Sequence, residues 1–245
     1  MGKTSHRLVA GLLIAIAITV SGCGRIGFSA LDADETTAHI ALVQSTDGWS
    51  SSKVTSRSVT LDAAPKLDDL VIVAVSTSFT IPVSVTDSAG NSYQGVPSNP
   101  TVNSGSYCNI LLYYARNATT TDTFTATVTG PSDDYLSVVV AEVAGTDPVA
   151  PLADNVRSAG MNASPMAGPI QSARDEALYF ALLCHNDTRT TTMGSDYQVL
   201  EIPTETGATN SAMVTAYKLG DAHPTEVAAM MSQSDSWQMM LTAFE

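Results

Sequence analysis

The sequence predicts an all-β protein, an antiparallel β-sandwich of the jelly-roll or immunoglobulin-like kind, built from two related halves. Three observations lead to this prediction. Thr, Ser, Ala and Val are abundant and only 14% of the residues are charged, which suits pleated strands with hydroxylated outer faces. Short apolar or β-branched runs alternate with turns rich in Gly, Pro, Asn and Asp, as in sandwiches and barrels. The third observation is an internal repeat between residues 67–145 and 174–245.

The first 22 residues have the layout of a secretory signal peptide. Lys3 and Arg7 precede an apolar run at 8–20, and the small residues Ser21 and Gly22 follow it. The run is shorter than the roughly 20 residues that a membrane-spanning helix needs. We therefore expect residues 1–22 to be a removable signal rather than a permanent transmembrane helix.

The cleavage region resembles the lipobox of bacterial lipoproteins, because Cys23 follows Val20, Ser21 and Gly22 directly. This resemblance implies that Cys23 is lipidated, that the chain is cut before it, and that several acyl chains hold the protein to a lipid bilayer. Gly24 replaces the aspartate that marks inner-membrane retention in that family, which implies the outer membrane. The alternative is an ordinary secreted protein in which Cys23 falls at this position by chance.

The segment after Cys23 shows no sustained periodicity, so we expect residues 23–37 to be a lipid-anchored flexible tether with a reach of roughly 20 Å. The body then divides into a first half at 38–150 and a second half at 151–245. The formal net charge is −13, and removal of the basic signal peptide makes it more negative. Such a surface repels nucleic-acid phosphates, so nucleic acid is excluded as a partner.

The expected strands follow one another at near-regular spacing. Residues 70–75 and 136–141 are apolar at almost every position, which predicts central strands covered on both faces. In 123–129 threonine occupies every second position, which predicts one face in water. The full set is 39–44, 54–61, 70–77, 81–86, 110–115, 123–129, 135–143, 178–184, 197–202, 212–217, 226–231 and 236–244.

The internal repeat is the most informative pattern in the body. A half of about 75 residues would bury too little surface alone, so we expect one compact unit or two closely packed halves. Residues 146–172, rich in Pro, Gly, Ala and Asn, would connect them. The repeat matches 68–75 with 175–182, 93–94 with 197–198, Tyr114 with Tyr217, 123–130 with 225–232, and 132–135 with 234–237.

Four segments resemble a β-sandwich module that occurs in many secreted bacterial proteins of unknown function. They are residues 87–93, 112–115, 135–145 and 237–244. The resemblance implies a fold and a location outside the cytoplasm, and it implies no chemistry.

No histidine or carboxylate pattern predicts a catalytic or metal site. His39, His185 and His223 lack the spacing of converging metal ligands. His185 could lie beside a hydroxyl as a catalytic base, but no G-x-S-x-G motif accompanies it. Paired carboxylates at 68–69 and 133–134 fit calcium ligands or hydrophilic turns, and we favour turns. We expect no cofactor and no enzyme activity.

Aromatic residues and cysteines supply the remaining candidates. Trp49, Tyr93, Tyr107 and Tyr113 could form a sugar-stacking surface, whereas we expect Trp237 in the core.

Beyond Cys23 the chain has Cys108 and Cys184. Two alternatives stand for this pair, a disulfide that joins the two halves or two small buried thiols.

Together these patterns predict a lipid-anchored protein of the cell envelope without catalytic activity, with a structural or macromolecule-binding role. Its expected partners are the bilayer, through acylated Cys23, and a polysaccharide or an envelope protein. The alternative functions are a carbohydrate-binding module and, less favoured, a hydrolase. An exposed aromatic patch would favour the first alternative, and a cleft that joins His185 to a hydroxyl and a carboxylate would favour the second.

Overall fold

The computed structural model describes residues 39–79, 82–100, 108–186, 190–201 and 212–245. The secondary-structure elements of these residues are all β-strands, and all strand pairs are antiparallel. The predicted fold class, an all-β antiparallel sandwich, is therefore confirmed. No helix in the described ranges is long and apolar enough to span a membrane. The signal peptide, Cys23 and the tether lie outside the described residues.

The first half is a sandwich of a five-stranded and a three-stranded sheet. The large sheet has the order β1-β8-β3-β6-β5 and the small sheet the order β2-β7-β4. All of β3 and almost all of β8 are buried, as predicted for central strands. The bounds are β1 Ala41–Trp49, β2 Val54–Thr60, β3 Leu70–Thr77, β4 Ser84–Asp87, β5 Gln94–Gly95, β6 Asn109–Arg116, β7 Thr125–Asp134 and β8 Leu136–Ala144.

The second half repeats this arrangement. Its large sheet has the order β13-β14-β11-β16-β9 and its small sheet the order β10-β15-β12. Trp237 is buried in the core between these two sheets, as expected. The bounds are β9 Leu152–Asn162, β10 Met166–Ile170, β11 Ala177–His185, β12 Thr191–Met193, β13 Gln198–Glu201, β14 Ala212–Gly220, β15 Thr225–Met231 and β16 Asp235–Phe244.

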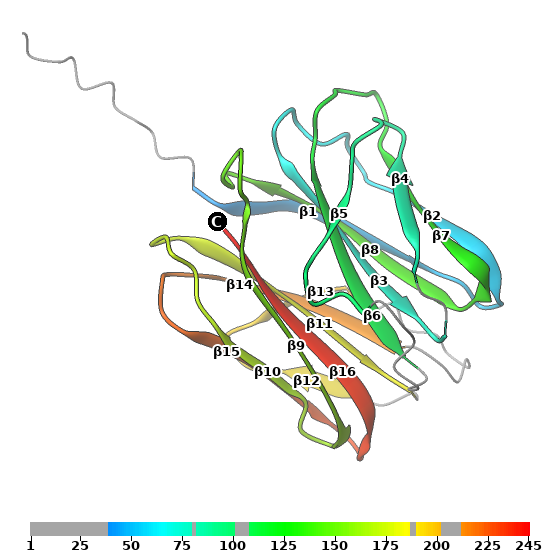
Figure 1. The fold of residues 1–245 in the computed structure, drawn as a ribbon, viewed down its shortest axis with the longest axis vertical. Coiled ribbons are helices and arrows are strands. Elements are labelled where there is room, and N and C mark those ends of the chain that lie inside the picture. Colours follow the sequence, from blue (N-terminus) through cyan, green and yellow to red (C-terminus); the bar gives the residue numbers. More distant parts are fainter. Residues whose placement is uncertain (1–38, 80–81, 101–107, 187–189, 202–211) are drawn as a thin grey trace, which may run out of the picture. The chain divides into compact units, whose positions relative to one another are not determined.

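The two large sheets pack against each other, so residues 37–245 form one compact unit of four layers (Figure 1). Ile72 and Val143 of the first half share a core with Phe180 and Phe244 of the second. The small sheets lie on the outside, each over a core of its own. The expectation of closely packed halves holds because each large sheet is apolar on both faces and requires cover on both.

The strand order of the two halves is the same when β1–β8 are matched with β9–β16 in turn. Gln94 pairs with Tyr114 and Gln198 with Tyr217, as the predicted repeat has them. In both pairs the tyrosine hydroxyl donates to the glutamine Oε1, at 3.3 and 2.7 Å. That the halves descend from one duplicated unit stays a prediction.

Elsewhere the predicted repeat alignment is wrong by one residue. Tyr114 pairs with Ile72, and Tyr217 pairs with Phe180. Ile72 therefore corresponds to Phe180, whereas the sequence alignment matched it with Tyr179. Side chains alternate between the faces of a strand, so this shift would exchange the two faces of β11.

The expected connector at 146–172 is also wrong, because it contains all of β9 and all of β10. Strand β9 is an edge strand that pairs only with β16, and most of its side chains are partly exposed. A strand with one neighbour and no fully buried face leaves a weak hydrophobic pattern, so the composition of this segment suggested a linker.

Candidate functional site

The outer face of the small sheet in the second half is the candidate functional site. Strand β15 buries every second residue and exposes Glu226, Ala228 and Met230 between them, as alternation on a strand requires. Met166 of β10 is exposed on the same side and pairs with Ala228. Met166 is 51% exposed and Met230 68%. We call the surface formed by Met166, Ala228 and Met230 the methionine face.

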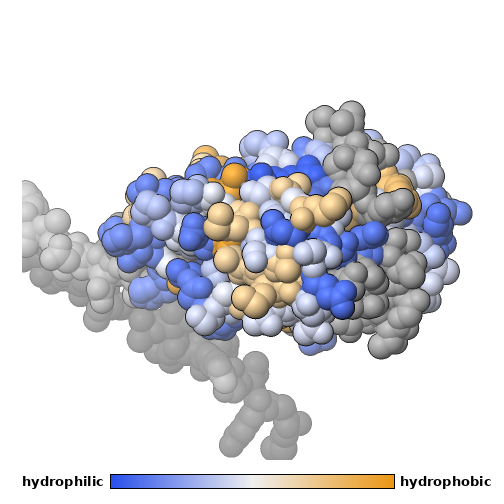
Figure 2. Space-filling model, turned by 90° about the horizontal axis from the view of Figure 1, so that it is seen from below, coloured by the Kyte–Doolittle hydropathy of each residue, from blue (hydrophilic) through white to orange (hydrophobic). Residues whose placement is uncertain are grey.

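Polar groups border the methionine face. Thr192 of β12 is exposed and pairs with Met230, and Glu226 precedes Ala228 on the same side of β15. Figure 2 views the molecule from the lower side of Figure 1, where β10, β12 and β15 lie, and shows pale-orange side chains gathered between hydrophilic ones.

The corresponding face of the first half carries hydroxyl groups instead. Ser58 pairs with Thr127 there, and their hydroxyl oxygens are 2.8 Å apart. The neighbouring pair Val59 and Ala126 corresponds to Ala167 and Val227 in the second half. The pair Ser58 and Thr127 therefore occupies the position of Met166 and Ala228. We call this surface the hydroxyl face, formed by Ser56, Ser58, Thr60, Ser84, Thr86, Thr125, Thr127 and Thr129.

The contrast between the two faces has a physical meaning. Thr125, Thr127 and Thr129 keep the hydroxyl face in contact with water, as the sequence predicted for this strand. The same fold therefore does not require methionine at these positions. Fully burying a methionine side chain is worth roughly 1.5–3 kcal/mol, so covering these two exposed methionines would be energetically favourable.

The structure does not bring the three described members of the predicted aromatic surface, Trp49, Tyr93 and Tyr113, together on one face. Tyr93 and Tyr113 pack against the core of the first sandwich, and their hydroxyls donate to Asp87 Oδ2 at 2.8 Å and to the Val83 carbonyl at 3.1 Å. Burial raises the pKa of both tyrosines.

Trp49 lies on the opposite face of the same sheet. It pairs with Ser137 of β8. The next residue, Val138, points into the core of the first sandwich, so Ser137 points to the other face of the sheet. Alternation along β1 and β8 thus separates Trp49 from the two tyrosines, and Tyr107 lies outside the described residues.

His185 lies beside a hydroxyl, but inside the second sandwich. Its Nε2 is 3.1 Å from Thr191 Oγ1, and the residue is 1% exposed. Because a substrate could not reach the imidazole in this arrangement, the geometry does not favour hydrolysis at His185.

The carboxylates near the strand starts bind backbone groups. Asp134 Oδ1 accepts a hydrogen bond from the Tyr135 N–H at 2.8 Å, and Asp235 Oδ1 accepts one from the Ser236 N–H at 2.7 Å. Such contacts are those of turn residues. In the part of the chain that the structure describes, no group of three or more His, Cys, Asp or Glu residues could hold a metal ion.

A carboxyl pair formed by the buried Glu142 and the partly buried Asp69 was not predicted. Glu142 of β8 is 1% exposed, and it accepts hydrogen bonds from Gln44 Nε2 at 2.6 Å and from the Lys66 N–H at 2.8 Å. Burial and a hydrogen bond with Glu142 raise the pKa of Asp69 from 3.8 to about 7. The only sequence signal was a glutamate within the apolar run 136–145.

The second half has alanine in place of both carboxyl groups. Val71 pairs with Glu142 and the corresponding Tyr179 pairs with Ala243, so Glu142 corresponds to Ala243. By the same register Asp69 corresponds to Ala177. Since Ala177 and Ala243 are buried in the second sandwich, the fold does not depend on a carboxyl pair here.

A pocket of about 380 Å³ lies at the end of the body where β1 begins. The charged groups that line it have partners among themselves, in nearby backbone groups and, for Glu176, in His39. Arg174 forms an ion pair with Asp147, and Glu245 Oε2 accepts hydrogen bonds from the turn at 172–174. The pocket therefore presents no unmatched group that would select a ligand.

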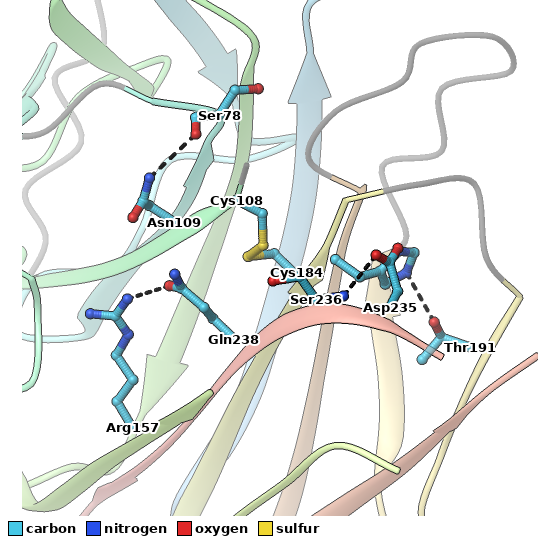
Figure 3. Close-up of a disulfide and its surroundings, with 10 residues drawn as sticks. Ser78, Cys108, Asn109, Arg157, Cys184, Thr191, Asp235, Ser236 and Gln238 are labelled. Carbon is cyan, nitrogen blue, oxygen red and sulfur yellow. Dashed lines mark hydrogen bonds between the residues drawn. A yellow bond between two sulfur atoms is a disulfide. The ribbon is translucent and has the colours of Figure 1, made fainter. Parts of the chain in front are cut away.

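The structure joins Cys108 and Cys184 in a disulfide, with 6.1 Å between their Cα atoms. Cys108 directly precedes β6 and Cys184 lies in β11, so the bridge links the first half to the second. Figure 3 shows the bridge, with the hydrogen-bonded Ser78 and Asn109 on the side of the first half.

Comparisons with known proteins do not assign a function to any of these features. No protein-family model matches the chain, and neither does any curated protein or solved structure.

Proposed function

We propose that the chain is a non-enzymatic lipoprotein of the cell envelope, anchored through acylated Cys23, whose body binds another protein at the membrane surface. The lipobox-like residues 20–23 support the anchor. They also support the outer membrane as the location, since Gly24 follows the cysteine. The acidic composition supports a partner other than nucleic acid.

The methionine face is the observation that carries the binding role. It is apolar at positions where the first half of the same chain has hydroxyl groups. Met166 and Met230 are unbranched side chains with a polarisable sulfur, a type that adapts to the shape of a partner. An envelope protein fits this surface better than a polysaccharide, because the aromatic residues that would stack on sugars are not gathered there.

Site-specific photocrosslinking in intact cells tests the proposal. A photoreactive amino acid replaces Met230 in one variant and Thr129 in the other, and these residues correspond in the two halves. We expect ultraviolet light to produce a discrete cross-linked protein species with the Met230 variant only. No product from either variant, or the same products from both, would contradict the proposed function.

A further inference from the structure

We propose that the methionine face binds the apolar side of a basic amphipathic segment of a partner protein. This inference rests on the proposed function and names the chemistry of the partner. Four observations carry it: the sequence of β15, the width of the apolar strip, the charge beside the strip, and the internal comparison with the hydroxyl face.

Strand β15 has the sequence of a strand that is covered on both sides. Every residue from Val227 to Met231 is apolar, as in the strands of a sheet buried on both faces. The inward residues Val227 and Met231 pack in the core of the second sandwich. The outward side of β15, with Ala228 and Met230, is not covered by any layer of the described residues.

The apolar strip fits one helix. Met166 is opposite Ala228, and Met230 lies two residues further along β15. The two methionines are therefore diagonal neighbours on adjacent strands, and such residues are about 7–8 Å apart. A helix with its side chains is about 10 Å wide, so one apolar stripe of an amphipathic helix can cover both methionines.

The charged residues of the second half favour a partner segment that is basic. Each basic side chain described in the second half is already engaged: Arg157 with Gln238, Arg174 with Asp147, and Lys218 with Asp196.

Glu226, at the end of the strip, forms no ion pair with another described residue. The carboxylate of Glu226, on a chain with a formal net charge of −13, attracts a segment that carries Lys or Arg and repels both a second copy of this acidic chain and an anionic lipid surface.

The test uses the mature lipidated protein in nanodiscs of zwitterionic lipid and a fluorescent peptide that forms an amphipathic helix of Leu and Lys. A peptide with Glu in place of Lys and a scrambled Leu/Lys peptide serve as controls. We expect fluorescence anisotropy to show saturable binding of the first peptide only, and this binding should weaken as salt is added.

Variants transfer the hydroxyl face onto the second half. The triple change Met166→Ser, Ala228→Thr and Met230→Thr copies residues that the first half already carries, and it should weaken binding at least tenfold. Glu226→Gln should weaken it severalfold and reduce its salt dependence. The reciprocal change, Ser58→Met, Thr127→Ala and Thr129→Met, should add a second binding site.

Equal binding of the acidic peptide, or binding that the triple variant retains, would overturn the inference. Concentration-dependent dimers that the triple variant abolishes would assign the face to a second copy instead. If no peptide binds while crosslinking at Met230 persists in cells, the proposed function stands and only the basic amphipathic partner is wrong. Circular dichroism of each variant checks its fold, and the two peptide controls keep the test valid if the triple variant misfolds.

Discussion

Replacing both Cys108 and Cys184 with serine is expected to lower the free energy of unfolding by about 4.5 kcal/mol. The bridge joins residues that are 76 apart in sequence. In the chain-entropy model, closing a loop of that length removes this much conformational freedom from the unfolded chain at 25 °C. Whole domains are stable by only about 5–15 kcal/mol, so the loss would be large.

Urea unfolding of three samples measures this change: the oxidised protein, the reduced protein and the double serine variant. Reduction breaks the bond but keeps both sulfur atoms, so it controls for altered packing around the serines. The chain has two tryptophans, Trp49 in the first half and Trp237 in the second. Variants with one of them changed to phenylalanine therefore report on each half separately.

We expect the two tryptophan signals to change at the same urea concentration, because the core between the large sheets is shared. Reduction should shift both midpoints downward together. The reasoning is refuted if reduction changes the unfolding free energy by less than about 1 kcal/mol, the value of one ordinary hydrogen bond. Separate transitions for Trp49 and Trp237 in the oxidised protein would refute the shared core.

Three further changes test other parts of the molecule. Because burial and Glu142 raise the pKa of Asp69 from 3.8 to about 7, the wild type should lose stability as the pH rises from 4 to 7. Asp69→Asn should reduce this loss, whereas Asp68→Asn, which changes the exposed neighbouring residue, should not. An equal pH dependence in both variants would contradict the interaction between Asp69 and Glu142. Cys23→Ala should abolish labelling with a radioactive fatty acid, and equal label in both proteins would contradict the anchor. Residues 36–150 and 151–245, expressed separately, should aggregate or be molten, whereas two monomeric fragments with sharp transitions would show independent domains.

The sequence predicted those parts of the fold whose patterns arise from one dominant environment. Strands β3 and β8 are apolar at most positions because both faces are covered, and β7 alternates because one face is wet. Strand β9 was missed because an edge strand has no such uniform environment. The repeat alignment followed matching letters, and only the register of Tyr114 and Tyr217 showed which residues share a face.

The candidate site was less predictable, since it depends on what lies opposite each strand. Trp49 and Tyr113 are attractive as residue types, but alternation places them on opposite faces of one sheet. The sequence predicted a strand at 226–231, but it did not show which side of that strand is covered. Only the sheet order shows that nothing described covers its outward side.

The position of the disulfide has a mechanical consequence. If the protein is tethered upstream of His39 and holds a partner on β10 and β15, tension enters at β1 and leaves through the opposite outer sheet. That tension must cross the contact between the two large sheets, where Cys108 and Cys184 form a covalent link. The bridge adds to the backbone link between β8 and β9 a second covalent connection, which would resist separation of the two large sheets under tension.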